Sequence, residues 1–409
     1  MRLQELSQHR INAVRFVMSA GFDIAVIGAG PVGLCFARAL AESGLQIVVL
    51  ERLAEPALAI PVFDGREIAL THHSVALMRK LGLWECIDPQ AISPLKDACV
   101  FNGSSLFSLN INHDDARKSE LGYLIANHHI RKAAYDSVKS SPAITLKTEA
   151  QVTSIHTDTN GVQLKLANGD VIHAKLLIGA DSRFSETRRA MGIAADMHDF
   201  GKTMMVCVME HTVSHEHTAW EWFDYGQTLA LLPMNGLRSS VVITLLPDEM
   251  NRLVKMNEED FNRDVSARFR HRLGAMRLVS TRHTYPLVSV YAKRLVGLRF
   301  ALVGDAAVGM HPVTAHGFNF GLKGIATLSA EIKTALASGK DIASNNLLLR
   351  YERTHRRDTR PLFLATHAIA KIYASNRPPA RLLRASALRI GSRINPFKRA
   401  VARLLADTH

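Results

Sequence analysis

The sequence is poor in the features that mark secreted, membrane-spanning and zinc-binding proteins. Only four of its 409 residues are cysteine, and they form no C-x-x-C pair and no zinc-finger spacing. This predicts buried thiols in a reducing compartment, and we expect no metal site. No run of about 18 apolar residues is present, so we expect no transmembrane helix. Residues 1–21 have no apolar core ahead of a cleavage site, so we expect an N-terminal extension and no secretory signal.

What is present is an ordinary globular composition with a basic excess. Hydrophobic residues make up 47% and charged residues 21%, with a formal net charge of +13. This composition excludes disordered and fibrous proteins. Much of the excess lies in residues 350–409, which carry fourteen Lys and Arg against three acidic residues. The aromatic interleaving of a nucleic-acid-binding module is missing, so we expect no nucleic-acid partner.

A glycine-rich turn follows the first predicted strand. Phe22–Ile27 predicts a buried strand, Pro31–Ser43 a helix and Leu45–Leu50 a second strand, which together form a βαβ unit. The turn between strand and helix, Gly28-Ala29-Gly30-Pro31-Val32-Gly33, matches G-x-G-x-x-G. Its glycines allow a tight turn, close approach of a pyrophosphate and close helix–strand packing. Glu51 ends the second strand, where a carboxylate can hold ribose hydroxyls. The unit predicts dinucleotide binding, of either NAD or FAD.

The rest of the chain predicts a two-part α/β architecture. Alternating runs over residues 151–178 indicate a meander that returns to a parallel sheet, and residues 200–290 hold strands typical of a mostly antiparallel sheet. We expect a discontinuous Rossmann-like FAD-binding domain, an inserted β-sheet substrate domain and a helical C-terminus. The expected limits are 22–195 and 285–345 for the FAD-binding domain (with parts of 60–130 on the substrate side), 196–284 for the inserted domain and 346–409 for the basic helical region.

Two distant segments favour FAD over NAD. Gly304-Asp305 follows a buried strand, at the sheet edge where α/β proteins bind ligands, and Asp305 would accept hydrogen bonds from a ribityl chain. The stretch Gly317–Gly321 opens a helix, whose N-terminal dipole would stabilise negative charge on a reduced flavin ring.

These motifs resemble one flavoprotein family. Gly28–Gly33, Gly179–Arg188 and Gly304–Gly321 stand in the order typical of aromatic hydroxylases with a para-hydroxybenzoate-hydroxylase-like fold. The resemblance covers about residues 22–370. It implies tightly bound FAD, NAD(P)H as a transient co-substrate and molecular oxygen. It also implies ring hydroxylation through a C4a-hydroperoxide of the flavin, chemistry that the cofactor supplies while the protein orients the substrate and excludes water. No catalytic side chain is assigned.

The same resemblance implies a set of cofactor-binding positions around the adenosine, pyrophosphate, ribityl and flavin-ring parts of FAD. The set is Gly28, Gly30, Pro31, Val32, Gly33, Glu51, Arg52, Arg66, Asn127, Asp181, Gly304, Asp305, Pro312, Gly317, Phe318 and Asn319. Ser182 stands where the family has glycine, which would cost energy if this turn needs a positive φ.

Two segments are similar to the ubiquinone-biosynthesis hydroxylases in particular, Asp64–Trp84 and His215–Pro233. The resemblance implies a polyprenylated phenol as substrate, with 5-hydroxylation of a demethoxyubiquinol-type ring preferred. The candidate substrate-pocket residues are Trp222, Leu231, Pro233 and His316. Two alternatives remain: a flavin-dependent reductase of prenyl double bonds, which would consume no oxygen, and an aromatic hydroxylase acting on a small soluble phenol.

The basic C-terminal region supports two interpretations. Arg381–Leu405 has apolar residues at helical spacing, which suits an anionic membrane surface. The alternative is a helical cap docked on the FAD-binding domain with its basic face in water. The first interpretation predicts a cytoplasmic protein held at the inner face of the cytoplasmic membrane, with other ubiquinone-biosynthesis proteins as further candidate partners.

Overall fold

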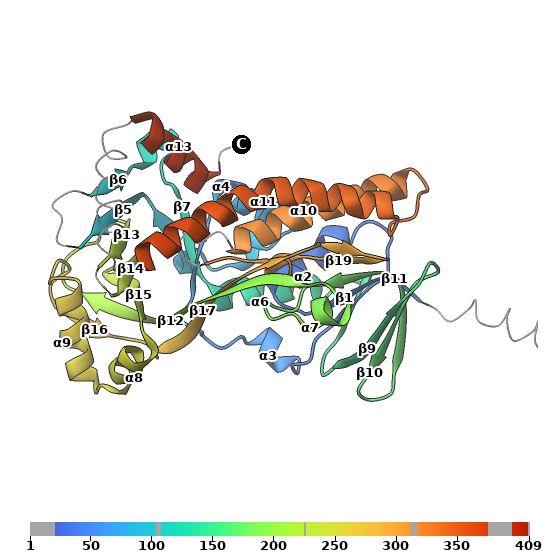
Figure 1. The fold of residues 1–409 in the computed structure, drawn as a ribbon, viewed down its shortest axis with the longest axis horizontal. Coiled ribbons are helices and arrows are strands. Elements are labelled where there is room, and N and C mark those ends of the chain that lie inside the picture. Colours follow the sequence, from blue (N-terminus) through green and yellow to red (C-terminus); the bar gives the residue numbers. More distant parts are fainter. Residues whose placement is uncertain (1–20, 104–107, 225, 312–316, 375–394, 408–409) are drawn as a thin grey trace, which may run out of the picture.

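The computed structural model describes residues 21–103, 108–224, 226–311, 317–374 and 395–407. It contains a mixed sheet with a parallel centre, a second, mostly antiparallel sheet, and a small third sheet (Figure 1). Long helices near the C-terminus lie along one side. This arrangement confirms the predicted α/β class with a helical C-terminus.

The first sheet contains the predicted βαβ unit. Its strands run in the order β18-β19-β11-β1-β2-β8, with β9 and β10 added as a hairpin on β11. The pairs among β19, β11, β1, β2 and β8 are parallel. The strands are β1 (Phe22–Ile27), β2 (Ile47–Leu50), β8 (Ile144–Lys147), β9 (Val152–Thr157), β10 (Val162–Leu166), β11 (Val171–Gly179), β18 (Val296–Gly297) and β19 (Phe300–Leu302).

The second sheet has nine strands, in the order β20-β17-β12-β15-β14-β13-β5-β6, with β16 beside β12. Only β13 and β5 pair in parallel, so two strands from the first third of the chain extend the sheet at one edge. The strands are β5 (Asp97–Asn102), β6 (Leu109–Ile111), β12 (Ala195–His211), β13 (Thr218–Phe223), β14 (Thr228–Pro233), β15 (Arg238–Leu245), β16 (Met276–Leu278), β17 (His283–Ala292) and β20 (Val308–Gly309).

The third sheet is small and antiparallel, in the order β3-β7-β4. Its strands are β3 (Glu67–Leu70), β4 (Ile92–Leu95) and β7 (Gly122–Ala126). The helices are α2 (Pro31–Leu40), α3 (Pro56–Ala59), α4 (His72–Lys80), α5 (His113–Ala116), α6 (Asn127–Val138), α7 (Glu186–Ala190), α8 (Pro247–Lys255), α9 (Glu258–Arg268), α10 (Gly317–Ala337), α11 (Asn345–Ala374) and α13 (Asn395–Ala406). Single turns of 3-10 helix occur at Trp84–Cys86, Pro89–Ala91 and Gly304–Ala306.

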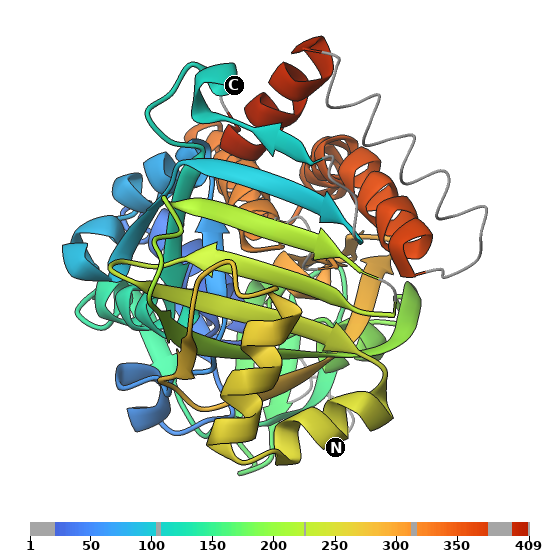
Figure 2. The same cartoon turned by 90° about the vertical axis from the view of Figure 1, so that its left-hand side faces the viewer.

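The two faces of the nine-stranded sheet have different surroundings. Helices α8 and α9 cover one face, as seen from that end of the molecule (Figure 2), and form a closed core with it. Leu229, Leu231 and Ile243 belong to this core and have no exposed surface. The alternate residues Ala230, Leu232 and Val242 keep accessible surface on the other face. Because side chains alternate along a strand, these three residues lie on the face that α8 and α9 leave uncovered, where Val206 and Thr244 are buried.

The helical C-terminus docks on protein where the structure describes it. In α13, Ala402 and Ala406 are buried against β6 and α5, with Val401 and Leu405 packed around them. The carboxylate of Asp407 lies 3.5 Å from the ammonium group of Lys323 on α10. For residues 395–407 this favours the docked-cap interpretation, since the apolar side of the helix is already occupied. Residues 381–394 of the predicted amphipathic segment, and residues 1–20, lie outside the described residues.

Within the described part, no helix combines the length and apolarity that crossing a bilayer would require.

The alternation of β14 predicts unequal effects for two adjacent leucines. Leu231→Ala would leave a cavity in a closed core and is expected to lower the free energy of unfolding by about 2–5 kcal/mol. Leu232→Ala removes a side chain that is already partly accessible, so a loss of about 1 kcal/mol or less is expected. Urea unfolding of the two variants checks this. Equal losses, or a larger loss for Leu232→Ala, would contradict the orientation of the strand.

Candidate active site

The predicted glycine turn joins β1 to α2 and leaves room for a ligand. Gly28 has a φ of +106°, and a Cβ there would lie 2.6 Å from the carbonyl oxygen of Ala180. Gly28 must therefore stay glycine. A Cβ on Gly30 would meet no atom within 4 Å. Gly30 is the N-cap of α2, no side chain caps this helix end, and Pro31 follows it. The free amides and the helix dipole suit a pyrophosphate, and the open space at Gly30 would admit one.

Glu51 lies next to this turn. Its carboxylate accepts hydrogen bonds from the backbone N–H of Ala29, at 2.9 Å, and of Leu53, at 3.0 Å. The first bond joins the end of β2 to the glycine turn, so the acid is held at the mouth of the site. Arg52 follows it and is exposed. Both residues therefore follow β2 directly beside the glycine turn.

Val32, in the first turn of α2, packs against glycines of the two late segments. A Cβ on Gly304 would lie 2.9 Å from Cγ1 of Val32, and one on Gly321 would lie 2.7 Å from its Cγ2. Gly304 also has a φ of +61°. Neither position accepts a side chain without moving Val32. The structure therefore brings the early and late glycine segments into direct contact.

The start of α10 is fixed to β3 by an asparagine. The Asn319 amide nitrogen donates to the carbonyl oxygen of Ala69 at 2.8 Å, and its oxygen accepts from the backbone N–H of Thr71 at 3.2 Å. A Cβ on Gly317 would lie 3.8 Å from Oδ1 of Asp305. Phe318 packs against the main core. Two further predicted site residues, Pro312 and His316, lie outside the described residues.

Arg66 and Asn127 meet at one carboxylate, that of Asp64. Arg66 Nη2 lies 2.6 Å and Asn127 Nδ2 lies 2.7 Å from Oδ2 of Asp64. The Tyr285 hydroxyl donates to the backbone oxygen of Asp64 at 2.7 Å, and Cζ of Arg66 lies 5.5 Å from the Tyr285 ring centre. Burial favours the neutral acid, but the hydrogen bonds and charge of Arg66 outweigh it and lower the pKa of Asp64. Arg66 is thus held as a fixed cation.

Asp181 and Asp305 are both held by hydrogen bonds from the segment around the start of α7. Asp181 accepts hydrogen bonds from the Ser185 hydroxyl, at 2.5 Å, and from the backbone N–H of Thr187, at 3.1 Å, at the start of α7. Arg183 Nη2 lies 3.0 Å from Oδ2 of Asp305. Ser182 is not among the residues with positive φ, so the absence of glycine there causes no backbone strain.

Sequence analysis missed several members of this site. Arg183 reaches Asp305 across 122 residues of sequence, which no local pattern predicts. Arg188 is almost fully buried and donates to the carbonyl oxygen of Ala306 at 2.9 Å, which fixes the turn that carries Asp305. Asp64 and Tyr285 were also not singled out. A signal existed only for Asp64, which stands two residues before Arg66 in the segment that resembles the family.

The structure places the predicted substrate-pocket residues of β13 and β14 on the side of the sheet that α8 and α9 cover. Trp222 and Leu231 belong to the closed core under α8 and α9, and Trp222 Nε1 donates to the carbonyl oxygen of Gly103 at 3.0 Å. Pro233 is also buried, and alternation puts it on the same face as Leu231. The neighbours Glu221 and Leu232 point to the opposite face, where both keep some accessible surface.

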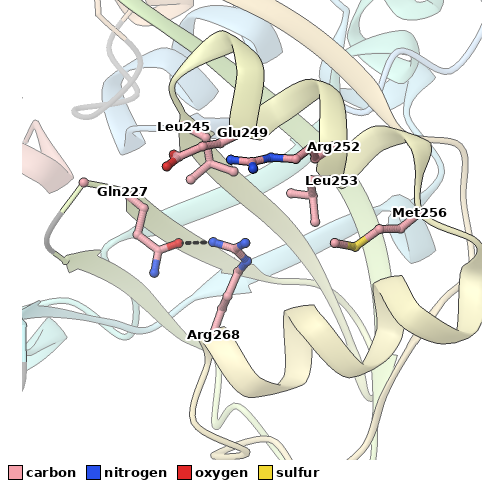
Figure 3. A pocket seen from close by; sticks show the side chains of 8 residues that line it. Gln227, Leu245, Glu249, Arg252, Leu253, Met256 and Arg268 are labelled. Carbon is pink, nitrogen blue, oxygen red and sulfur yellow. Dashed lines mark hydrogen bonds between the residues drawn. The ribbon is translucent and has the colours of Figure 1, made fainter.

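A separate hollow of about 360 Å³ lies at the far end of the second sheet, beside α8 (Figure 3). Arg268 reaches across it to the side-chain oxygen of Gln227. The labelled lining residues come from β15, α8, the link between α8 and α9, α9 itself and the segment before β14. No predicted site residue lines this hollow, so it is distinct from the glycine-rich site.

Comparison with known proteins identifies the family. A family model described as an FAD-binding domain matches residues 21–362. The ubiquinone hydroxylase UbiM of Neisseria meningitidis is 45% identical over 95% of this chain and 86% of its own length. The ubiquinone hydroxylase UbiL of Rhodospirillum rubrum is 34% identical over 93% of this chain and 88% of its own length. The 3-demethoxyubiquinol 3-hydroxylase of Escherichia coli is 28% identical over 92% of this chain and 96% of its own length.

Solved structures share the fold at low sequence identity. The p-nitrophenol 4-monooxygenase PnpA of Pseudomonas putida superposes with a TM-score of 0.77 at 19% identity, covering 95% of this chain and 99% of PnpA. HpxO of Klebsiella pneumoniae, solved in complex with FAD and uric acid, superposes with a TM-score of 0.74 at 20% identity, covering 93% and 96%.

The open space at Gly30 predicts a variant that folds but binds FAD poorly. Gly30→Ala adds a methyl group that no protein atom opposes, so the fold should stay intact while the pyrophosphate is displaced. We expect FAD affinity to fall at least tenfold, about 1.4 kcal/mol. Gly297→Ala, where a Cβ meets only ordinary contacts, is the matched control. Flavin absorbance after dialysis, with circular dichroism of both apoproteins, checks this. Full flavin retention by Gly30→Ala would refute the assignment.

The described residues fit a flavin dinucleotide. The open space at Gly30 lies at an uncapped helix N-terminus, acidic and basic side chains flank it, and the glycine segments meet where the family motifs require. The family match covers more than four fifths of the chain. The chain therefore belongs to the FAD-binding domain family of FAD-dependent monooxygenases.

Proposed function

We propose that the protein hydroxylates the ring of a polyprenylated phenol in ubiquinone biosynthesis, with a demethoxyubiquinol-type ring as the preferred substrate. The proposal rests on one observation above the others. A protein named ubiquinone hydroxylase is 45% identical over 95% of this chain. A relative whose name specifies a ring position, a 3-demethoxyubiquinol 3-hydroxylase, is 28% identical. These names support the substrate class and the type of reaction.

We propose the following contacts to FAD. The amides at the start of α2 hold the pyrophosphate, and Glu51 with Arg52 meets the adenosine ribose. At the other end of the site, Arg66 and Asn127 approach from β3 and α6. Asp305 and the start of α10 would lie beside the ribityl chain and the flavin ring, where the helix dipole favours negative charge.

The ring of the substrate would bind between the third sheet and the open face of the second. These two walls are joined at two points. Asn235, just after β14, donates its backbone N–H to the Ser93 hydroxyl at 3.0 Å. At the other end, Gly65, just before β3, lies very close to Val206 on β12. A Cβ on Gly65 would be only 2.7 Å from Cγ2 of Val206. Asn319 ties the start of α10 to Ala69 on β3. The inferred space between the walls, which we call the inter-sheet space, therefore lies next to the flavin-ring end of the site.

The chemistry would be divided between cofactor and protein. When bound, FAD supplies electron transfer from NAD(P)H and the activation of oxygen. The residues of this chain bind and orient the ring, and the apolar walls exclude water. Arg66, fixed by Asp64, provides a positive charge at the edge of the inter-sheet space. Ala230 and Val242, which keep accessible surface, offer an apolar surface that suits an aromatic ring.

Two alternatives are separated from this proposal by their products. A reductase of prenyl double bonds would oxidise NAD(P)H without consuming oxygen. A hydroxylase of a small soluble phenol would act on unprenylated rings as well as on prenylated ones. The names of the relatives favour the prenylated substrate over both.

We also propose that α13 approaches an anionic membrane surface, where a prenylated ring would be found. Arg399 and Arg403 are exposed on this helix while its apolar side is docked on protein. The attraction would therefore be electrostatic, at about 1 kcal/mol for each basic side chain. Arg399→Ser with Arg403→Ser is expected to weaken binding to phosphatidylserine vesicles about thirtyfold, measured by co-sedimentation at low salt. Equal binding to neutral phosphatidylcholine vesicles would contradict this contact.

The test of the function is coupled turnover by the purified yellow protein. With a short-chain demethoxyubiquinol analogue, we expect substrate-stimulated consumption of NAD(P)H and oxygen in equal amounts, with a product one oxygen atom heavier. Oxygen electrode, absorbance and mass spectrometry measure the three quantities. Gly30→Ala, loaded poorly with FAD, is the matched negative control. NAD(P)H oxidation without oxygen uptake would replace the proposal by the reductase.

A further inference from the structure

Glu221 lies in the middle of β13, on the face that borders the inter-sheet space. Its neighbours Trp220 and Trp222 pack with the closed core on the other face, so alternation turns the Glu221 side chain toward the inter-sheet space. Cross-strand pairing puts it in one row with Val100, Ala230, Val242 and Val206. Glu221 is the acidic member of an apolar row.

Protein surrounds the Glu221 carboxyl group, but the residue is not fully buried. Burial raises the pKa of Glu221 to about 8, with no other contribution. The residue nevertheless keeps accessible surface. Within the described residues it has no hydrogen-bond or ion-pair partner. This combination is expected of a side chain that lines an internal cavity, because a core carboxyl would need a partner.

The groups around Glu221 carry little charge. On the neighbouring strands, the residues that share its face cannot titrate: Val100 and Asn102 on β5, Thr228, Ala230 and Leu232 on β14, and Ser240, Val242 and Thr244 on β15. The facing wall carries Glu67, whose Oε1 is buried without a partner and whose pKa burial also raises to about 8. Asp64, Arg66 and Tyr285 lie at one end of the inter-sheet space, and the Lys323–Asp407 pair lies toward α13. None of these contributes to the shift of Glu221.

We propose that the Glu221 carboxylate binds the hydroxyl group of the aromatic substrate and accepts its proton while the ring is hydroxylated. This inference rests on the proposed function, and it assigns the acid–base group that the sequence left unassigned. A phenol supplies the hydrogen-bond donor that an unpartnered carboxylate in an apolar wall lacks. Glu67, on the facing wall, is the competing group.

The step is a proton transfer with no change of oxidation state. The O–H bond of the phenol breaks, and the proton forms an O–H bond with the Glu221 carboxylate. The electron pair left on the phenol oxygen is delocalised into the ring. The ring thereby becomes a better nucleophile toward the oxygen atom that is added to it. The proton returns to the product oxygen when the aromatic ring is restored. General-base assistance of this kind contributes about a hundred- to ten-thousandfold in rate.

The pH profile of the holoenzyme tests the proposal. Because the carboxylate is the reactive form, wild-type kcat/KM for hydroxylation should rise about tenfold between pH 7 and 9, following the free enzyme's base. Glu221→Gln keeps size and polarity but cannot accept the proton. We expect it to lose this rise and to have at least a hundredfold lower kcat/KM at pH 9, with normal FAD content. Glu210→Gln, at an exposed acid of the same sheet, should behave as wild type.

Each outcome decides one point. Loss of the rise in Glu221→Gln but not in Glu67→Gln supports the proposal. Loss in Glu67→Gln alone would assign the role to the facing wall and overturn it. An unchanged profile in Glu221→Gln, with wild-type hydroxylation intact, would also overturn it while leaving the proposed function standing. If the demethoxyubiquinol analogue neither stimulates oxygen consumption by the wild type nor yields a hydroxylated product, the proposed function itself fails.

A stability measurement gives a second readout that does not depend on turnover. Since folding raises the pKa of Glu221 from an ordinary value near 4.5 to about 8, the folded state holds this proton more tightly. Wild-type stability should therefore fall relative to Glu221→Gln as pH rises from about 4.5 to 8. The substrate phenol should reduce this difference, because it pairs with the ionised group. Thermal unfolding with and without a substrate analogue checks both, and a difference that the phenol does not change would overturn the binding assignment.

Discussion

The contact between Val32 and the two glycines Gly304 and Gly321 is the constraint on which the site depends. It permits α2 to begin directly against the end of β19 and the start of α10. An added methyl group at either glycine would force these elements apart. The dinucleotide turn, the acid at the sheet edge and the flavin-ring end would then no longer share one space. The contact is short-ranged and apolar, yet it brings the early glycine turn, the Gly304-Asp305 turn and the start of α10 together.

The two ends of the proposed ligand site differ in polarity. Near Glu51 and the start of α2, backbone amides and charged side chains suit phosphates and sugars. Beyond Ala69, two sheets present mostly apolar faces with isolated carboxyl groups between them. A hydroxylase needs both, because its cofactor is polyanionic and its aromatic substrate is not. Asn319 is the link between the halves, since it bonds to β3 from the first turn of α10.

Sequence patterns predicted those parts of the structure whose residues are close to one another in the sequence. The strand at Phe22–Ile27, the glycine turn and the second strand follow from hydrophobic periodicity and turn chemistry. The orientation of β13 and β14 could not be predicted in the same way, because both faces of these strands carry apolar residues and alternation alone does not say which face meets α8 and α9. The structure places Trp222 in the closed core on the side of α8 and α9, and its part in substrate binding stays a prediction. The pair Arg183–Asp305 depends on tertiary folding across 122 residues, and sequence proximity gave no signal for it.

The distance in sequence between Gly33 and Gly321 has a consequence for synthesis on the ribosome. At about 5–20 residues per second, a wait on the order of tens of seconds separates the emergence of the early glycine turn from that of its partner glycines. The antiparallel sheet, complete except for β20 by the end of β17, emerges before α10 and gains its cover of α8 and α9 first. Until then the nucleotide turn lacks the contacts of Gly304 and Gly321 with Val32. Flavin loading is thus a late event in the life of the nascent chain, and a product truncated before α10 would contain the turn without the contacts that close the site.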